Sequence, residues 1–132
     1  MAGADLDPSS VGLPRLAVSR LPRIAVISTG DELVEPGLPV LDHQIRRSNS
    51  HGLAAALALA GYPPETDLHL PDDVAELQRS LGRELDRHDV LVVSGGVSAG
   101  RFDHVPAALA ALGVQKVFHQ VAQRPGRPLW FG

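Results

Sequence analysis

The stretch VLVVSGGVSAGRFD, Val90 to Asp103, decides the fold. It opens with four branched apolar residues, a run typical of a strand that is covered on both faces of a parallel sheet. Three glycines, two serines and finally an acid follow. Glycine lets the backbone approach a ligand closely, and hydroxyl and main-chain N–H groups can then bind it. The stretch predicts a strand at 90–94 that ends in a ligand-binding loop, Ser94 to Gly100; a plain strand-to-helix turn is the alternative.

Strand-like and helix-like segments alternate along the rest of the chain. The run IAVIS, Ile24 to Ser28, indicates another strand, and apolar residues at helical spacing in 74–87 indicate a helix. This alternation predicts a doubly wound, mostly parallel sheet in a three-layer α/β/α domain. The expected strands are 24–28, 66–70, 90–94, 114–121 and 128–131. The expected helices are one that is capped by Ser48 or Asn49 and stopped by Gly61, one over 74–87, and one between Asp103 and Gly113.

Length and composition fit one domain. The 132 residues suffice for a single core, with a flexible leader predicted at 1–10 and the domain at 11–132. There is no cysteine, which excludes disulfides and thiolate chemistry. No apolar run approaches the roughly 18 residues of a membrane span, and no signal-peptide core is visible. We therefore expect a cytoplasmic protein that has no membrane partner.

Charge is unevenly distributed. The net charge of −3 argues against a nucleic-acid partner. After Asp103 the chain has no acid, whereas Lys116, Arg124 and Arg127 are basic. Within this segment RPGRP, Arg124 to Pro128, presents two guanidinium groups on a stiff turn, and arginine suits bidentate contact with phosphate or another oxyanion. An anion site is predicted here; a plain surface turn is the alternative.

Acidic motifs follow two other predicted strands. STGDE, Ser28 to Glu32, follows the first strand, and Pro71, Asp72 and Asp73 follow the strand at 66–70. Ligands of such sheets bind beyond the carboxyl ends of the strands. One carboxylate could orient a hydroxyl or a water while another holds a cation. Together with the arginines, these acids predict Mg²⁺-assisted chemistry on a phosphorylated ligand; solvated loop acids and helix caps are the alternative.

Taken together, the motifs resemble the MoeA family of molybdopterin molybdotransferases. IAVISTGDELVEPG, QIRRSN, PDD, SGGVSAGRFD and RPGRPLWFG follow one another in the family's order and approximate spacing, from about Val11 to the last residue. The resemblance implies the molybdopterin-binding fold of the family's central domain, which MogA and the C-terminal half of gephyrin share. It also implies that the domain is incomplete at its C-terminal end and that the family's other domains are absent.

The resemblance further implies an activity, the insertion of molybdate into adenylylated molybdopterin with release of AMP and a need for Mg²⁺. A MogA-like adenylyltransferase would be a partner, and the full-length protein would be a homodimer. Glu32, Asp72 and Asp103 match acids implicated in activity, and Asp72 and Asp103 are the expected metal ligands. The expected ligand-binding residues are Thr29, Gly30, Asp31, Asn49, Ser94, Gly95, Gly96, Val97, Ser98, Arg124, Gly126 and Arg127.

The chain departs from the family pattern at several positions. RPGRP carries arginines where lysines are usual, Gln120 replaces another usual lysine, and Arg47 stands where an acid is common. Arginine keeps the charge but changes the hydrogen-bond geometry. Two other classes of function stay open. One is a non-catalytic module that binds molybdopterin or a nucleotide, which Gln120 favours, and the other is a gephyrin-like scaffolding domain.

Overall fold

The computed structural model of the chain describes residues 12, 14, 15, 17–96 and 104–132. The leader expected at 1–10 lies outside these residues. So do residues 97–103, which include most of the glycine loop and three expected site residues, Val97, Ser98 and Asp103. The described residues do include the three strand ends that precede the predicted motifs.

A three-stranded parallel sheet forms the centre of the molecule. Strand β1 (Ile24–Thr29) lies between β4 (Thr66–Leu70) and β5 (Val90–Ser94). Every residue of β1 is buried, as its continuous apolar run predicts for a central strand. The bounds of β4 and β5 agree with the predicted ranges. Because β5 is an edge strand of this sheet, its residues are only half-buried or exposed.

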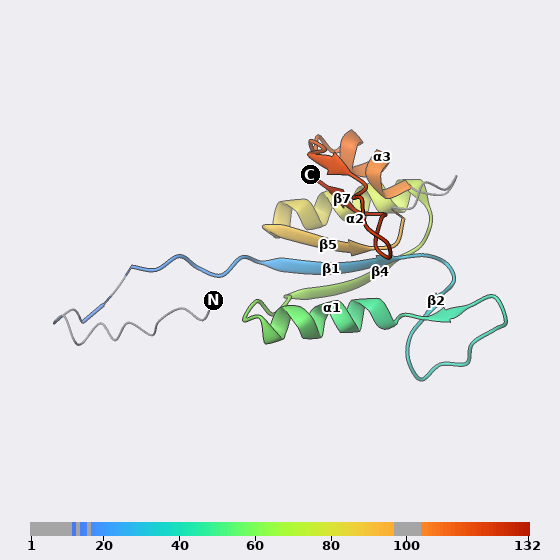
Figure 1. The fold of residues 1–132 in the computed structure, drawn as a ribbon, viewed down its shortest axis with the longest axis horizontal. Helices are drawn as coiled ribbons and strands as arrows, with labels where there is room; N and C mark the ends of the chain where they lie inside the picture. The colour runs from blue at the N-terminus through green and yellow to red at the C-terminus, as the bar shows by residue number, and fades with distance from the viewer. Residues whose placement is uncertain (1–11, 13, 16, 97–103) are drawn as a thin grey trace.

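Helices cover both faces of the sheet, which confirms the predicted three-layer α/β/α architecture. Figure 1 shows α1 (Ser48–Leu59) on one face and α2 (Val74–Arg87) with α3 (His104–Ala111) on the other. The apolar side of α2 buries Leu77 and Leu81 against the core. Asp73 caps α2, since its side chain accepts a hydrogen bond of 2.7 Å from the backbone N–H of Glu76.

The predicted cap of α1 is wrong. The helix begins at Ser48, so its N-cap residue is Arg47, and no side chain of the described residues caps it. The side chain of Arg47 is bound elsewhere, to Ser28, Glu35 and Asp67. As a result, the first N–H groups of α1 lack a side-chain acceptor. The helix ends at Leu59, and Gly61 follows with a φ of +87°, as expected of a helix stop.

Four short strands differ from the predicted ranges. The segment 29–47, for which no strand was predicted, contains the two-residue strands β2 (Leu33–Val34) and β3 (Ile45–Arg46), which pair in parallel. The strands expected at 114–121 and 128–131 shrink to β6 (Phe118–His119) and β7 (Trp130–Phe131), an antiparallel pair outside the main sheet. Gln120 ends β6 because its φ of +71° lies outside the extended region.

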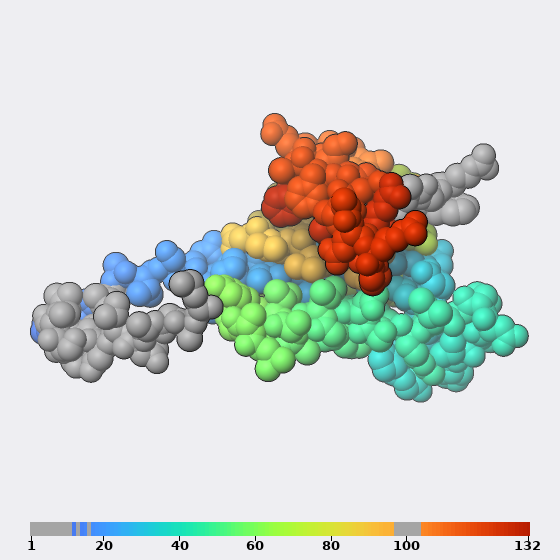
Figure 2. Space-filling view, in the orientation of Figure 1, coloured from blue at the N-terminus to red at the C-terminus, as the bar shows by residue number. Residues whose placement is uncertain are grey.

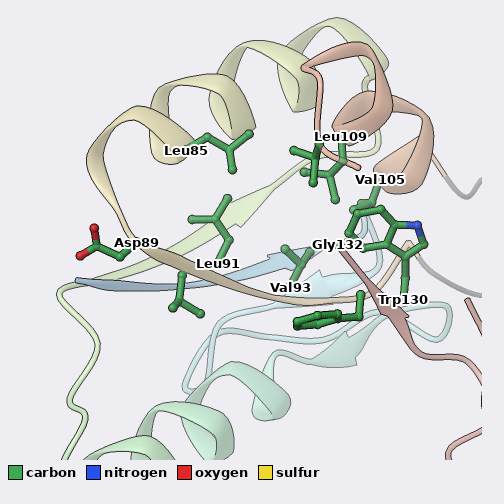
Figure 3. Close-up of a pocket in the computed structure, with 11 residues that line it drawn as sticks. Leu85, Asp89, Leu91, Val93, Val105, Leu109, Trp130 and Gly132 are labelled. Atoms are coloured by element: carbon green, nitrogen blue, oxygen red, sulfur yellow. The ribbon is translucent and has the colours of Figure 1, made fainter. Parts of the chain in front are cut away.

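An apolar cavity of about 320 Å³ lies between β5, the helices α2 and α3, and the C-terminal strand. Figure 3 shows Trp130 beside Val93 and Val105, with the carboxylate of Asp89 at the margin. Among the described residues of the lining, Asp89 has the only ionisable side chain. This cavity therefore has few groups that could bind a polar ligand or take part in a reaction.

Polar groups at the amino ends of the strands are well satisfied. Asp89, just before β5, accepts hydrogen bonds from the guanidinium groups of Arg20 and Arg23 and from the backbone N–H of Arg23. Nearby, the side chain of His88 lies 3.0 Å from Thr66 Oγ1 and 3.2 Å from the carboxylate of Glu84, which is 3% exposed. These contacts fix the amino end of the sheet.

Candidate ligand site at the carboxyl edge

The carboxyl ends of the three strands meet at one edge of the sheet. In the register of the sheet Ser28 lies opposite Ser94, and Thr29 lies opposite Leu70. The motifs that follow these strands are therefore neighbours in space, as the parallel arrangement predicts. We refer to this end of the sheet, built on Thr29, Leu70 and Ser94, as the carboxyl edge.

The glycine pair after β5 is required by packing against β1. A Cβ atom on Gly95 would lie 2.5 Å from the carbonyl oxygen of Thr29, and one on Gly96 would lie 2.6 Å from Val105 Cγ2. Both glycines also have positive φ angles, of +101° and +61°. The sequence suggested that these glycines make room for a ligand. The structure gives a first reason that involves only the protein: they let the loop cross Thr29 and α3 closely.

Gly30 has a similar relation to Glu32. A Cβ atom on Gly30, whose φ is +137°, would lie 2.4 Å from Oε2 of Glu32. The carboxylate of Glu32 thus rests against the bare α-carbon of Gly30. The backbone of Gly30 is itself held from β4, because its N–H donates to Leu70 and its carbonyl lies 2.8 Å from His69 Nε2. Glu32 is therefore positioned by a well-anchored turn.

Arg47 ties three segments together beneath this edge. It is only 6% exposed, and its Nε donates to Ser28 Oγ at 2.6 Å. Its two terminal nitrogens bind the carboxylates of Glu35 and Asp67. The hydrogen bond from Arg47 lowers the pKa of the Glu35 carboxyl. The charge of Arg47 is thus matched by two carboxylates, and a ligand would gain little from it.

A cavity of about 180 Å³ lies between β1, the start of α1 and the end of β5. Two hydroxyls here are buried and without a partner among the described residues: Oγ1 of Thr29, which is 3% exposed, and Oγ of Ser50, which is fully buried. Asn49 Nδ2 lies 3.5 Å from Ser94 Oγ across the cavity. Native proteins seldom leave buried hydroxyls unsatisfied, so these two stand out within the described part of the chain. The lining residues are Ser28, Thr29, Glu32, Leu33, Ile45, Arg46, Arg47, Ser48, Asn49, Ser50, Ser94 and Gly95.

A second, wider cavity of about 620 Å³ continues from the first. The two share Ser48, Asn49, Ser94 and Gly95. Its far wall is Pro128–Trp130, the segment that follows the RPGRP turn. Figure 2 shows this red C-terminal segment lying over the gold strand β5 and reaching the green side of the molecule. The C-terminal segment therefore borders the carboxyl edge, although it lies far from β1 in sequence.

The two arginines of the turn line a third hollow of about 580 Å³, together with residues 120–123. There Arg127 donates a hydrogen bond of 3.3 Å to the side-chain oxygen of Gln120. Neither arginine lines the two cavities at the carboxyl edge. The turn is adjacent to the predicted site through Pro128, but its guanidinium groups do not enter the part of the site that the structure describes.

The acids after β1 and β4 approach each other. The backbone N–H of Asp72 donates to Asp31 Oδ1 at 3.1 Å. Among the described residues no group of three or more potential metal ligands is found. Since Asp103 is outside that range, the predicted pair of Asp72 and Asp103 is not tested.

No described helix combines the length and the apolar character needed to cross a membrane.

The structure thus groups part of the predicted set. Thr29, Glu32, Asn49, Ser94 and Gly95 line one cavity, with Gly30 directly beneath Glu32. Sequence reasoning missed Ser50 and Arg47 as residues of this site. Ser50 could have been found from its place in the first turn of a predicted helix, since that turn begins at the carboxyl edge of the sheet. The other described residues of the predicted set are Asp31 and Asp72 just after β1 and β4, Gly96 against Thr29, and Arg124, Gly126 and Arg127 in the adjacent turn.

These features define a doubly wound α/β domain whose candidate ligand site lies at the carboxyl edge of its sheet. Residues 25–132 match the family described as a probable molybdopterin binding domain, and the chain belongs to that family. The resemblance to the MoeA family that the motifs indicated is confirmed by curated relatives and by solved structures.

One relative is a molybdopterin molybdenumtransferase of Synechocystis, 43% identical over 124 residues, which cover 94% of this chain and 32% of the relative. A molybdopterin molybdenumtransferase 2 of Mycobacterium tuberculosis is 39% identical, again over 94% of this chain and 32% of the relative. The chain therefore spans about a third of the length of these relatives.

Among solved structures, the molybdopterin biosynthesis MoeA protein from Pyrococcus horikosii superposes with a TM-score of 0.70 at 31% identity. The match covers 92% of this chain and 30% of that one. The CinA protein from Thermoplasma acidophilum gives a TM-score of 0.59 at 22% identity, over 74% of this chain and 54% of that one. The second likeness concerns the fold alone.

Proposed function

We propose that the chain is the ligand-binding domain of a molybdopterin molybdotransferase of molybdenum cofactor biosynthesis. The reaction would insert molybdate into adenylylated molybdopterin and release AMP. The observation that carries this proposal is the polar cavity at the carboxyl edge, where Thr29, Asn49 and Ser94 converge in a chain that belongs to the molybdopterin-binding family. The names of the relatives, molybdopterin molybdenumtransferases, support the same activity.

The proposed roles are those that the resemblance to the MoeA family implies. Thr29, Gly30, Asp31, Asn49 and the loop from Ser94 to Ser98 would bind the ligand at the carboxyl edge. Arg124, Gly126 and Arg127 would bind its anionic part from the adjacent turn, since guanidinium groups suit phosphate and oxyanions. Glu32, Asp72 and Asp103 would supply the carboxylates that act on the reacting groups.

Magnesium is a proposed cofactor, and carboxylates of the kind expected here suit it chemically. Mg²⁺ keeps several waters and is usually held by one or two carboxylates together with substrate phosphates. Asp72, which is half-buried and donates its backbone N–H to Asp31, would be one ligand, and Asp103 would be the other. When bound, the ion would neutralise phosphate charge on the ligand.

The wider setting is also proposed from the family. Adenylylated molybdopterin and molybdate would be the substrates, a MogA-like adenylyltransferase would supply the first of them, and the full-length protein would be a cytoplasmic homodimer. The relatives' names contain molybdopterin and molybdenum, and this supports the two substrates in general terms.

Calorimetric titration of the 132-residue chain with molybdopterin and with its adenylylated form tests the proposal. We expect binding, and we expect Arg124→Ala to weaken it about tenfold through loss of a charge-assisted contact. Arg87→Ala is the matched control, because it removes the same charge at the exposed end of α2. Absence of binding, or an equal loss in both variants, would contradict the proposal. Adding molybdate and Mg²⁺ then separates the activities: AMP release supports the transferase, and binding without release supports the binding module.

A further inference from the structure

We propose that Arg47 is a positioning residue of the ligand site, which fixes Asn49 relative to the central sheet and does not itself bind the ligand. The inference rests on the proposed function, because Asn49 is one of the residues that would bind the ligand. Arg47 stands immediately before α1, and its side chain reaches back to β1. The resemblance to the MoeA family does not supply this role, since an acid is common at this position of the family pattern.

Arg47 contacts three other segments through three different nitrogen atoms. Its Nε donates to Ser28 Oγ at 2.6 Å, at the end of β1. One terminal nitrogen binds the carboxylate of Glu35, just after β2, and the other binds that of Asp67 on β4. Because these two carboxylates already match its charge, Arg47 would attract a bound anion only weakly. Its contacts instead tie the start of α1 to two strands of the main sheet.

The rest of α1 has few buried side chains that could hold its first turn in place. Among the residues of this helix only Ser50 is buried, and Leu59 is 91% exposed. Leu53 and Leu57 are half-buried. Helix α2, in contrast, buries several side chains of one face, leucines among them, against the core. The position of the first turn of α1 therefore depends strongly on Arg47, the residue at its N-cap.

The contact between Arg47 and Ser28 bears directly on the width of the cavity at the carboxyl edge. Ser28 lies opposite Ser94 in the register of β1 and β5. Asn49 comes two residues after Arg47, and its Nδ2 lies 3.5 Å from Oγ of Ser94 across the cavity. Arg47 thus holds the first turn of α1 to the strand that neighbours β5. Without this contact, the amide of Asn49 would lose its fixed distance from Ser94.

Calorimetric titration of the full chain with molybdopterin, in wild type and in Arg47→Lys, tests this role. Lysine keeps the charge, but its one nitrogen cannot replace three nitrogens that point to three partners. We expect Arg47→Lys to be folded by circular dichroism and to bind molybdopterin about tenfold more weakly than wild type. A loss of affinity in a fully folded variant is not explained by a change in global stability.

A double-mutant cycle shows whether Arg47 acts through Asn49. Asn49→Ala removes the amide and should by itself weaken binding about tenfold. If Arg47 acts by placing that amide, Arg47→Lys should weaken binding less than about twofold further in the Asn49→Ala background. A purely structural role of Arg47 predicts the same loss in both backgrounds. Equal losses would therefore overturn the inference.

Arg23→Lys is the matched control, because Arg23 also binds a carboxylate, that of Asp89, but at the opposite end of the sheet. It should keep the wild-type affinity even where its urea midpoint falls. If Arg47→Lys does not fold, Glu35→Ala removes one of the three partners and should weaken binding about threefold.

The outcomes separate this inference from the proposed function. Wild-type affinity in the folded Arg47→Lys variant, or in Glu35→Ala where it takes its place, would overturn the role of Arg47 and leave the proposed function intact. An equal loss of affinity in Arg23→Lys would do the same. If the wild-type chain does not bind molybdopterin, the proposed function fails, and the role of Arg47 fails with it.

Discussion

The two ends of the central sheet treat their polar groups in opposite ways. At the amino edge, Asp89 accepts hydrogen bonds from two arginines, and His88 lies between Thr66 and Glu84. At the carboxyl edge, the hydroxyls of Thr29 and Ser50 are more deeply buried than the carboxylate of Asp89 but have no partner among the described residues. Both ends belong to the same three strands, so the sheet alone does not explain the difference.

The two sets of polar groups can have different roles, one in stability and the other in binding. A satisfied buried network stabilises the fold, whereas an unsatisfied buried group costs stability and is retained where another molecule can satisfy it. Within 17–96 and 104–132, hydrogen bonding therefore offers a way to distinguish structural polar residues from candidate binding residues. Residues chosen from the two ends should respond differently to matched substitutions, and such pairs test the distinction.

The largest effect is expected for Gly95→Ala. The new Cβ would lie 2.5 Å from the carbonyl oxygen of Thr29, and the φ of +101° is unfavourable for alanine. Overpacking and backbone strain together should lower the free energy of unfolding by about 3 kcal/mol or more. Gly113→Ala is the matched control, because Gly113 has a φ of +85° and open space around it, so strain alone should cost about 1–2 kcal/mol. Urea unfolding followed by circular dichroism measures both; equal losses would show that the contact with Thr29 is unimportant.

A smaller but more informative effect is expected for the same substitution at the two edges. Thr66→Val leaves the buried ring of His88 without its hydroxyl partner and should cost about 1–2 kcal/mol of unfolding free energy. Thr29→Val removes a hydroxyl that has no described partner, so stability should stay the same or rise by up to about 1 kcal/mol. Molybdopterin binding should be weakened only in Thr29→Val. A large loss of stability in Thr29→Val would mean that its hydroxyl is satisfied within the protein.

The smallest change in unfolding free energy at neutral pH is expected for Asp89→Asn. It is best detected through the pH dependence of stability. Hydrogen bonds from Arg20 and then Arg23 hold the pKa of Asp89 far below its usual value. With an unfolded-state pKa of about 3.9, the stabilisation is fully present above that pH and is lost progressively as the pH falls below it. Wild type should therefore be more stable than Asp89→Asn at pH 7, and the difference should shrink between about pH 4 and pH 2. A constant difference in urea midpoint across this range would show that the charge of Asp89 contributes nothing.

The sequence predicted correctly those elements whose hydrophobic pattern is compatible with one type of secondary structure. Strand β5 and helix α2 have the predicted bounds, because a branched apolar run and a regular apolar spacing each allow one structure. The approach of Thr29 to Ser94 was also predictable, since parallel strands bring their carboxyl ends to one edge.

The remaining features depend on contacts between distant residues. Arg47 became the N-cap of α1 because its side chain binds Ser28, Glu35 and Asp67, and no local pattern announces such a network. The buried hydroxyl of Ser50 depends on where α1 packs. The short β6 and β7 reflect the backbone of Gln120, for which the sequence carries no signal.

The contacts of Asp89 have a practical consequence for experiments on this chain. Because Arg20 and Arg23 fasten residues 20–23 at the start of β1, the N-terminal segment leaves the sheet at the end opposite the candidate site, as Figure 1 shows for 17–23. A fluorophore attached to a side chain within 17–23 would therefore lie at the end of the sheet away from Thr29 and Ser94. Labelling at these positions leaves the candidate site uncovered.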